Sequence, residues 1–167
     1  MIGLIVSVIV LLLGAILQST ALARIAVAGV KVDLVLLLVV AWSIRRGIED
    51  GILWAFIGGL AVDLLSVGPP GASVIGYGCA AVLAGSLGPS LRQISVLLPL
   101  ILTPLTAVIA LLVSAIVMAA VGWPMPWPAT VALVILPSAA FDSLAMFIVY
   151  PLVSAADRRP FAPDWSV

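Results

Sequence analysis

Residues 93–141 decide the fold class, and they read QISVLLPLILTPLTAVIALLVSAIVMAAVGWPMPWPATVALVILPSAAF. These 49 consecutive residues include no Lys, Arg, Asp or Glu. A helix needs ~20 apolar residues to cross a hydrocarbon core about 30 Å thick, so the segment is long enough for two crossings. Its centre, GWPMPWP at 122–128, is rich in proline and breaks a helix. The segment therefore predicts two membrane helices, at about 95–121 and 129–153.

The rest of the chain has the same apolar character. Seven basic and seven acidic residues make up 8% of the 167 residues, whereas 65% are apolar, and the mean hydropathy is +1.40. A soluble domain would carry a surface with ~25–35% charged residues. In lipid, only helices and closed barrels satisfy their own backbone groups, and barrel strands alternate apolar and polar residues. Continuous runs such as 8–13 and 35–40 do not alternate, so we predict an all-α, polytopic membrane protein.

Four further helices are predicted where charges and turn residues interrupt the apolar sequence. They span about 2–23, 31–44, 48–65 and 72–91. The six transmembrane helices then form one bundle over 1–153, and residues 154–167 are a short cytoplasmic tail. The second helix is the shortest, with 11 residues between Asp33 and Arg45. We expect its flanking charged side chains to lengthen it by reaching toward the interfaces.

The basic residues predict the orientation, because cytoplasmic loops carry an excess of Lys and Arg. With six spans, both termini and the second and fourth loops lie on one side of the membrane. That side has five basic residues, which are Arg45, Arg46, Arg92, Arg158 and Arg159. The opposite side has Arg24 and Lys31. Both termini are therefore expected in the cytoplasm, with the five arginines as topology anchors.

The sequence lacks the residues on which many catalytic and metal sites depend. It has no histidine, and its one cysteine, Cys79, falls in the fourth predicted helix, where we expect it to be buried. This composition excludes Cys/His metal sites and catalysis by a nucleophile paired with histidine. A phosphate-binding Gly-x-x-x-x-Gly-Lys motif does not occur either. We therefore predict a protein that is not an enzyme, needs no cofactor and binds no nucleic acid.

Asp142 interrupts the sixth predicted helix near its middle. A charge at the bilayer centre costs about 2.5 to 3.5 kcal/mol, whereas the ten Leu, Ile, Phe and Val residues between Val131 and Val149 contribute ~−4 kcal/mol. Insertion therefore remains favourable, but the carboxyl group should face protein or water rather than lipid. It is either a ligand for an ion or a substrate, or a carboxyl group bonded to a neighbouring helix. Pro137, five residues earlier, is expected to kink this helix.

Asp33 and Asp63 are the acidic residues expected at the outer face. Asp33 begins the second helix, where the helix dipole favours a carboxylate, whereas Asp63 lies near the end of the third, where the dipole disfavours it. Asp63 therefore needs a partner, for which Arg24 and Lys31 are the candidates on that side. Two interpretations are open: structural or partner-binding pairing, and a solute site built from Asp33, Asp63 and Gln18.

Small residues recur at every fourth position of the third and fourth helices. In the third helix they are Gly47, Gly51, Ala55 and Gly59, and Asp63 takes the next position of the series. In the fourth helix they are Ala72, Gly76, Ala80, Ala84 and Gly88. Residues at this spacing share one helix face, and small side chains on that face allow close helix packing in lipid. Each ridge either packs within the chain or receives a transmembrane helix of another protein.

One segment combines several of these features in a characteristic order. Asp33-Leu34 opens the second helix and a Leu/Val-rich run follows, then Gly47-x-x-x-Gly51, GGLAVDLL at 58–65, and a glycine loop that ends at Gly71. With Leu17-Gln18 near the end of the first helix, this pattern resembles the bacterial rod shape-determining protein MreD family. The chain length, the number of spans and the short loops agree with that family.

The resemblance implies a non-enzymatic subunit of the bacterial cell-elongation complex in the inner membrane, which scaffolds peptidoglycan synthesis and regulates cell shape. The implied partners are MreC first, and also MreB and the RodA/penicillin-binding-protein synthase. Asp33 and Asp63 would hold a partner where it leaves the membrane. The alternative is a substrate-binding membrane subunit of an energy-coupling-factor vitamin transporter. Such a subunit needs several convergent polar side chains, of which the predicted helices offer few.

Overall fold

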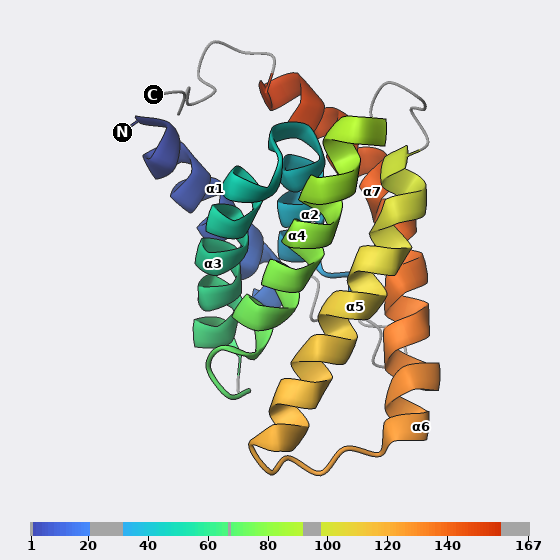
Figure 1. Cartoon of the computed structure of the whole chain (residues 1–167). Coiled ribbons are helices and arrows are strands. Elements are labelled where there is room, and N and C mark those ends of the chain that lie inside the picture. The colour runs from blue at the N-terminus through green and yellow to red at the C-terminus, as the bar shows by residue number, and fades with distance from the viewer. Residues whose placement is uncertain (1, 21–31, 67, 92–97, 158–167) are drawn as a thin grey trace.

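The computed structural model describes residues 2–20, 32–66, 68–91 and 98–157, and the regular elements in these ranges are all helices (Figure 1). They are α1 (Ile2–Thr20), α2 (Leu34–Arg46), α3 (Ile48–Leu65), α4 (Ala72–Leu91), α5 (Leu98–Ala120), α6 (Trp127–Thr130), the π-helical segment η2 (Val131–Ile135) and α7 (Leu136–Asp157). The all-α prediction is thus confirmed for this part of the chain. Helices Pro99–Ala120 and Trp127–Ala155 are long and apolar enough to cross a membrane.

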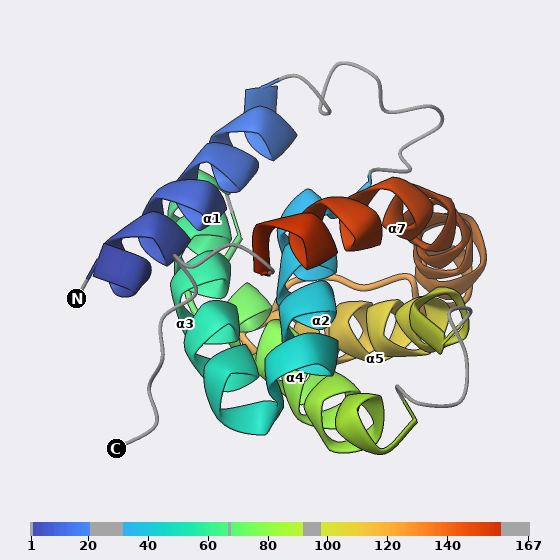
Figure 2. The same cartoon turned by 90° about the horizontal axis from the view of Figure 1, so that it is seen from above.

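The helices run up and down beside one another (Figure 1). The end of α2, the start of α3, the end of α4, the start of α5 and the end of α7 lie at the upper end in this view. The extended loop between α5 and α6 lies at the lower end. Seen from above, α1 crosses the outside of α3 at a steep tilt, and the last turns of α7 arch over the bundle (Figure 2).

Helix α2 is the centre of the bundle. Its 13 residues include nine that are buried, and it packs against α1, α3, α4, α5 and α7. At 1.5 Å per residue it is ~20 Å long, which is shorter than a hydrocarbon core. The expected lengthening at its amino-terminal end is not seen, because the Asp33 side chain caps the helix. A helix surrounded by other helices does not have to match the thickness of the lipid.

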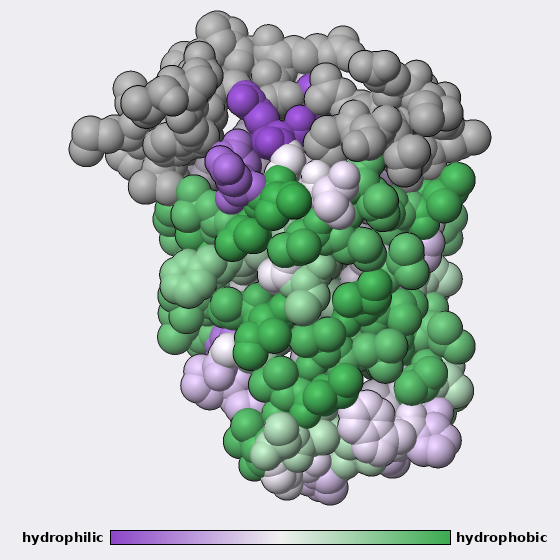
Figure 3. All heavy atoms as spheres, viewed as in Figure 1, coloured by the Kyte–Doolittle hydropathy of each residue, from purple (hydrophilic) through white to green (hydrophobic). Residues whose placement is uncertain are grey.

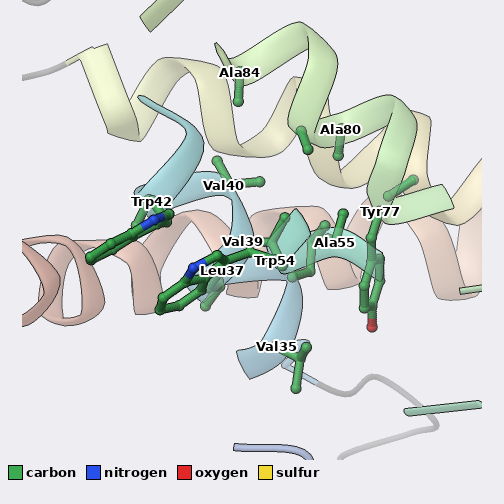
Figure 4. Close-up of a cluster of buried hydrophobic side chains, with 14 of the residues drawn as sticks. Val35, Leu37, Val39, Val40, Trp42, Trp54, Ala55, Tyr77, Ala80 and Ala84 are labelled. Atoms are coloured by element: carbon green, nitrogen blue, oxygen red, sulfur yellow. The ribbon is translucent and has the colours of Figure 1, made fainter. Parts of the chain in front are cut away.

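An aromatic pair joins α2 to α3. The rings of Trp42 and Trp54 stack with their centroids 4.4 Å apart and their planes 13° from parallel. The Arg46 guanidinium lies 5.6 Å from the centroid of the Trp42 ring, which is a cation–π distance. Figure 4 shows both tryptophans in the buried cluster that α2, α3 and α4 form together.

The small-residue ridges pack within the chain. A Cβ atom at Gly51 would lie 2.9 Å from the Ser43 Cβ, and one at Gly59 would lie 2.6 Å from the Val74 Cα. On α4, a Cβ atom at Gly88 would lie 2.5 Å from the Ile44 Cα. Helix backbones therefore approach each other where only glycine fits, as small-x-x-x-small packing requires. In this structure both ridges are covered by neighbouring helices of the same chain, so neither is open to a partner helix.

Two prolines alter the backbone of α5 and of the last helical stretch. Pro104 has no N–H for the Leu100 carbonyl, and the Ser143 hydroxyl of α7 donates to that carbonyl instead, at 3.1 Å. Pro137 follows η2, in which the Leu136 N–H bonds to the Val131 carbonyl five residues earlier. The hydrogen-bond ladder just before Pro137 is thus locally π-helical, and the kink itself stays a prediction.

The outer surface of the bundle is apolar. Figure 3 shows hydrophobic residues across the face that α3, α4 and α5 form, with the most hydrophilic residues at the upper end and mildly hydrophilic ones at the lower end. Cys79 lies exposed on α4, so the prediction that it is buried was wrong. An apolar helix position can face lipid as readily as protein, and sequence hydropathy does not distinguish the two cases.

Candidate functional site

Three side chains cap the amino-terminal end of α2, two from other helices and one from its own N-cap residue. The Gln18 Oε1 atom of α1 accepts from the Val35 N–H at 3.0 Å, and the Asp142 Oδ1 atom of α7 accepts from the Asp33 N–H at 2.8 Å. Asp33 itself is the N-cap residue and accepts from the Leu36 N–H at 3.1 Å. The first N–H groups of a helix have no partner within it, and inside a protein they need such acceptors.

Tyr77 of α4 completes this group of side chains. Its hydroxyl donates to the Asp33 Oδ2 atom at 2.5 Å, and the Tyr77 ring lies in the apolar cluster of Figure 4. Sequence reasoning missed this residue. A usable signal was present, because Tyr77 is the one aromatic residue of helix 72–91 and a buried phenol needs a hydrogen-bond partner. We call Gln18, Asp33, Tyr77 and Asp142 the polar cluster.

Asp142 is the most deeply placed member of the polar cluster. Its side chain is 0% exposed, whereas Asp33 and Gln18 are each partly exposed. The Asp142 Oδ2 atom has no hydrogen-bond partner in the part of the chain that the structure describes. Of the two interpretations of Asp142, bonding to a neighbouring helix describes its Oδ1 atom. The Oδ2 atom makes no such bond, so the interpretation of Asp142 as a ligand for an ion or a substrate stays open.

Asp63 belongs to a different arrangement. Its carboxylate accepts from the Gly71 N–H at 2.7 Å and from the Ser73 N–H at 3.0 Å. Both donors stand at the start of α4, where the helix dipole favours a negative charge. Asp63 therefore has the partner that its place near the end of α3 demands. The alternative candidates, Arg24 and Lys31, lie outside the described residues.

The predicted solute site is not assembled in this structure. Gln18 and Asp33 meet at the start of α2, whereas Asp63 holds the turn before α4 with both carboxylate oxygens. The described residues also contain no group of three or more His, Cys, Asp or Glu side chains placed to hold a metal ion. Through its hydrogen bonds, the polar cluster fixes α1, α4 and α7 against the amino-terminal end of α2.

The opposite end of α2 carries the basic pair predicted to set the topology. The Arg45 Nη1 atom donates to the Ser154 hydroxyl of α7 at 2.9 Å, and Arg46 lies over Trp42. Helix α7 is thus tied to both ends of α2, through Asp142 at one end and Ser154 at the other. The other predicted anchors, Arg92, Arg158 and Arg159, lie outside the described residues.

These features define an all-helical membrane protein whose few polar side chains hold its helices together. The family model for the rod shape-determining protein MreD matches residues 1–156, so the chain belongs to the MreD family. It is therefore a membrane protein with a role in rod shape determination, as the order of motifs between Val32 and Gly71 predicted. Comparison with curated proteins and with solved structures gave no match.

Proposed function

We propose that this chain is a multi-pass, non-enzymatic subunit of the bacterial inner membrane that holds other subunits of the cell-elongation machinery through transmembrane helix contacts. The observation that carries the proposal is the family match over residues 1–156. In this arrangement six helices cross the bilayer with α2 enclosed by the others, and both termini face the cytoplasm. The subunit acts on peptidoglycan synthesis by positioning the proteins that perform it.

The distribution of side chains supports this orientation. Arg45 and Arg46 stand at one end of the bundle, where cytoplasmic basic residues are expected. Trp123 and Trp127 are exposed beside the loop at the other end, and tryptophan prefers the headgroup level of a membrane. Apolar side chains cover the surface between the two ends (Figure 3).

The outer faces of the bundle are the surfaces that remain for partner helices, because the glycine ridges are covered. Helix α7 carries a stripe of large apolar side chains that are 64–72% exposed: Leu144, Phe147, Ile148 and Leu152. Their spacing of three to four residues places them on one helix face, as in helix-to-helix recognition. We place the transmembrane helix of MreC on this stripe.

Photo-crosslinking in living cells tests both the function and the face. A photoreactive amino acid at Phe147 should crosslink to MreC, whereas the same amino acid at Ile101 of α5, which is 70% exposed, should not. Crosslinking at Ile101 alone would move the contact to another face while retaining the function. Depletion of the chain should produce round cells. The proposed function would be contradicted if cells stayed rod-shaped after depletion and MreC were crosslinked at neither position.

A further inference from the structure

Two carboxylates meet inside the bundle without a basic side chain of the described residues beside them. Asp142 bonds to the backbone of Asp33, and Asp33 binds Tyr77 and the Leu36 N–H. Arg45 and Arg46 stand at the other end of α2, which is ~18 Å away at 1.5 Å per residue. The dipole of α2 supplies about half a positive charge at this end. With both carboxylates ionised, the net charge at this end of α2 therefore remains negative.

The missing hydrogen-bond partner belongs to one oxygen atom. The Asp142 Oδ2 atom is buried and has no hydrogen-bond partner among the described residues, although the Oδ1 atom of the same carboxylate has one. Buried charged oxygens of this kind are costly unless a proton, a cation or a donor reaches them. Because the other polar contacts of the cluster are made, this oxygen marks the position that an additional group would occupy.

We propose that Asp142 and Asp33 form a binding site for one monovalent cation, either Na⁺ or a proton, centred on the Asp142 Oδ2 atom. Hard cations prefer oxygen ligands. The Asp142 carboxylate bonds to the backbone of Asp33, and the Asp33 carboxylate in turn accepts from the Tyr77 hydroxyl. One oxygen of the cluster lacks a partner among the described residues, whereas a divalent ion such as Ca²⁺ or Mg²⁺ takes roughly six or more oxygen ligands. Asp33 is partly exposed, which gives the cation a route to Asp142.

Among the described residues, the neighbouring elements contribute no further charged side chain to the site. Helix α4 contributes the Tyr77 hydroxyl and α1 contributes the neutral Gln18 amide. Residues 98–120 of α5, which packs against α7, contain no charged side chain. Binding or release of one positive charge here therefore acts directly on the contact between α2 and α7. The site would couple the packing of α7, which carries the exposed apolar stripe, to the sodium or proton concentration.

Thermal unfolding of the purified full chain in detergent tests the site. With saturating NaCl in place of N-methylglucamine chloride, Na⁺ binding should raise Tm by about 5 °C, the size expected for a ligand in ~100-fold excess over Kd. If the occupant is a proton, Tm without Na⁺ should instead fall from pH 6 to pH 8, because the bound proton is lost as the pH rises. The Asp142→Asn variant should lose whichever response the wild type shows.

Asp63→Asn is the matched control, because the Asp63 carboxylate binds two backbone N–H groups outside the cluster. It should keep the wild-type response even if its own Tm is lower. Asp33→Asn is the second variant in case Asp142→Asn does not fold, and it should also abolish the response. A wild-type Tm that is unchanged by Na⁺ and by pH overturns the proposal. An equal response in the foldable aspartate variant overturns it as well.

Discussion

Asp142 shows how a single side chain explains two unusual features of the chain. It is a carboxyl group in an apolar helix, and it caps a helix that begins inside the protein. The need for a protein or water partner was predictable from the cost of a charge in lipid. The identity of the partner was not, because the Asp33 N–H is 109 residues away in sequence and no local pattern connects the two. Tyr77 did carry a local signal, as the one aromatic residue of helix 72–91, but its partner Asp33 is 44 residues away in sequence.

The hydroxyl of Tyr77 should contribute measurably to stability. Tyr77→Phe removes the donor to the Asp33 Oδ2 atom and should lower the free energy of unfolding by about 1.5–3 kcal/mol, as for a buried hydrogen bond to a charged group. Tyr150→Phe is the control, since the Tyr150 hydroxyl makes no hydrogen bond in the described part of the chain. Denaturant unfolding of both variants in detergent measures the difference. Equal losses would contradict a specific role of the Tyr77 hydroxyl.

At the scale of elements, the sequence predicted where helices lie better than what surrounds them. The predicted bounds 48–65 and 72–91 coincide with α3 and α4, because Gly47 and the Gly68–Gly71 turn mark clear ends. The burial of α2 was not predictable, since lipid and a protein interior are equally apolar and select the same side chains. The same ambiguity explains Cys79, which was predicted to be buried and lies exposed.

Two glycines give a matched test of close helix packing. Gly59→Ala would place a Cβ atom 2.6 Å from the backbone of Val74, so α3 and α4 must separate. We expect a loss of about 1–3 kcal/mol of stability, as for overpacked cores. Gly78→Ala places its Cβ atom in open space and should leave stability unchanged or raise it, because alanine favours the helix. Thermal unfolding in detergent compares them, and equal Tm values would show that α3 and α4 do not pack as described.

At the scale of the whole molecule, the exterior of the bundle is apolar like its core, unlike the exterior of a soluble protein. The buried residues include Asp63, Asp142, Thr103, Thr106 and Ser138, whereas Phe147, Leu144 and Ile101 are among the most exposed side chains. Asp63 and Asp142 join one helix to another, because a buried carboxyl group needs a partner that lipid cannot provide. Thr103 and Thr106 bond instead to carbonyls of their own helix. The apolar exterior determines no orientation by itself. The arginines and tryptophans at the ends therefore have to set the direction of insertion.

The orientation can be measured with single cysteines in a Cys79→Ser background. Ser66 lies exposed after α3, at the end expected to face outward, and Glu49 lies exposed beside Arg45 and Arg46, at the end expected to face the cytoplasm. A membrane-impermeant maleimide applied to intact spheroplasts should label Ser66→Cys but not Glu49→Cys, and permeabilised cells should label both. The reverse pattern would show that the basic pair does not face the cytoplasm. Labelling of both sites, or of neither, in intact spheroplasts would mean that α3 does not cross the membrane, since its two ends would then lie on one side.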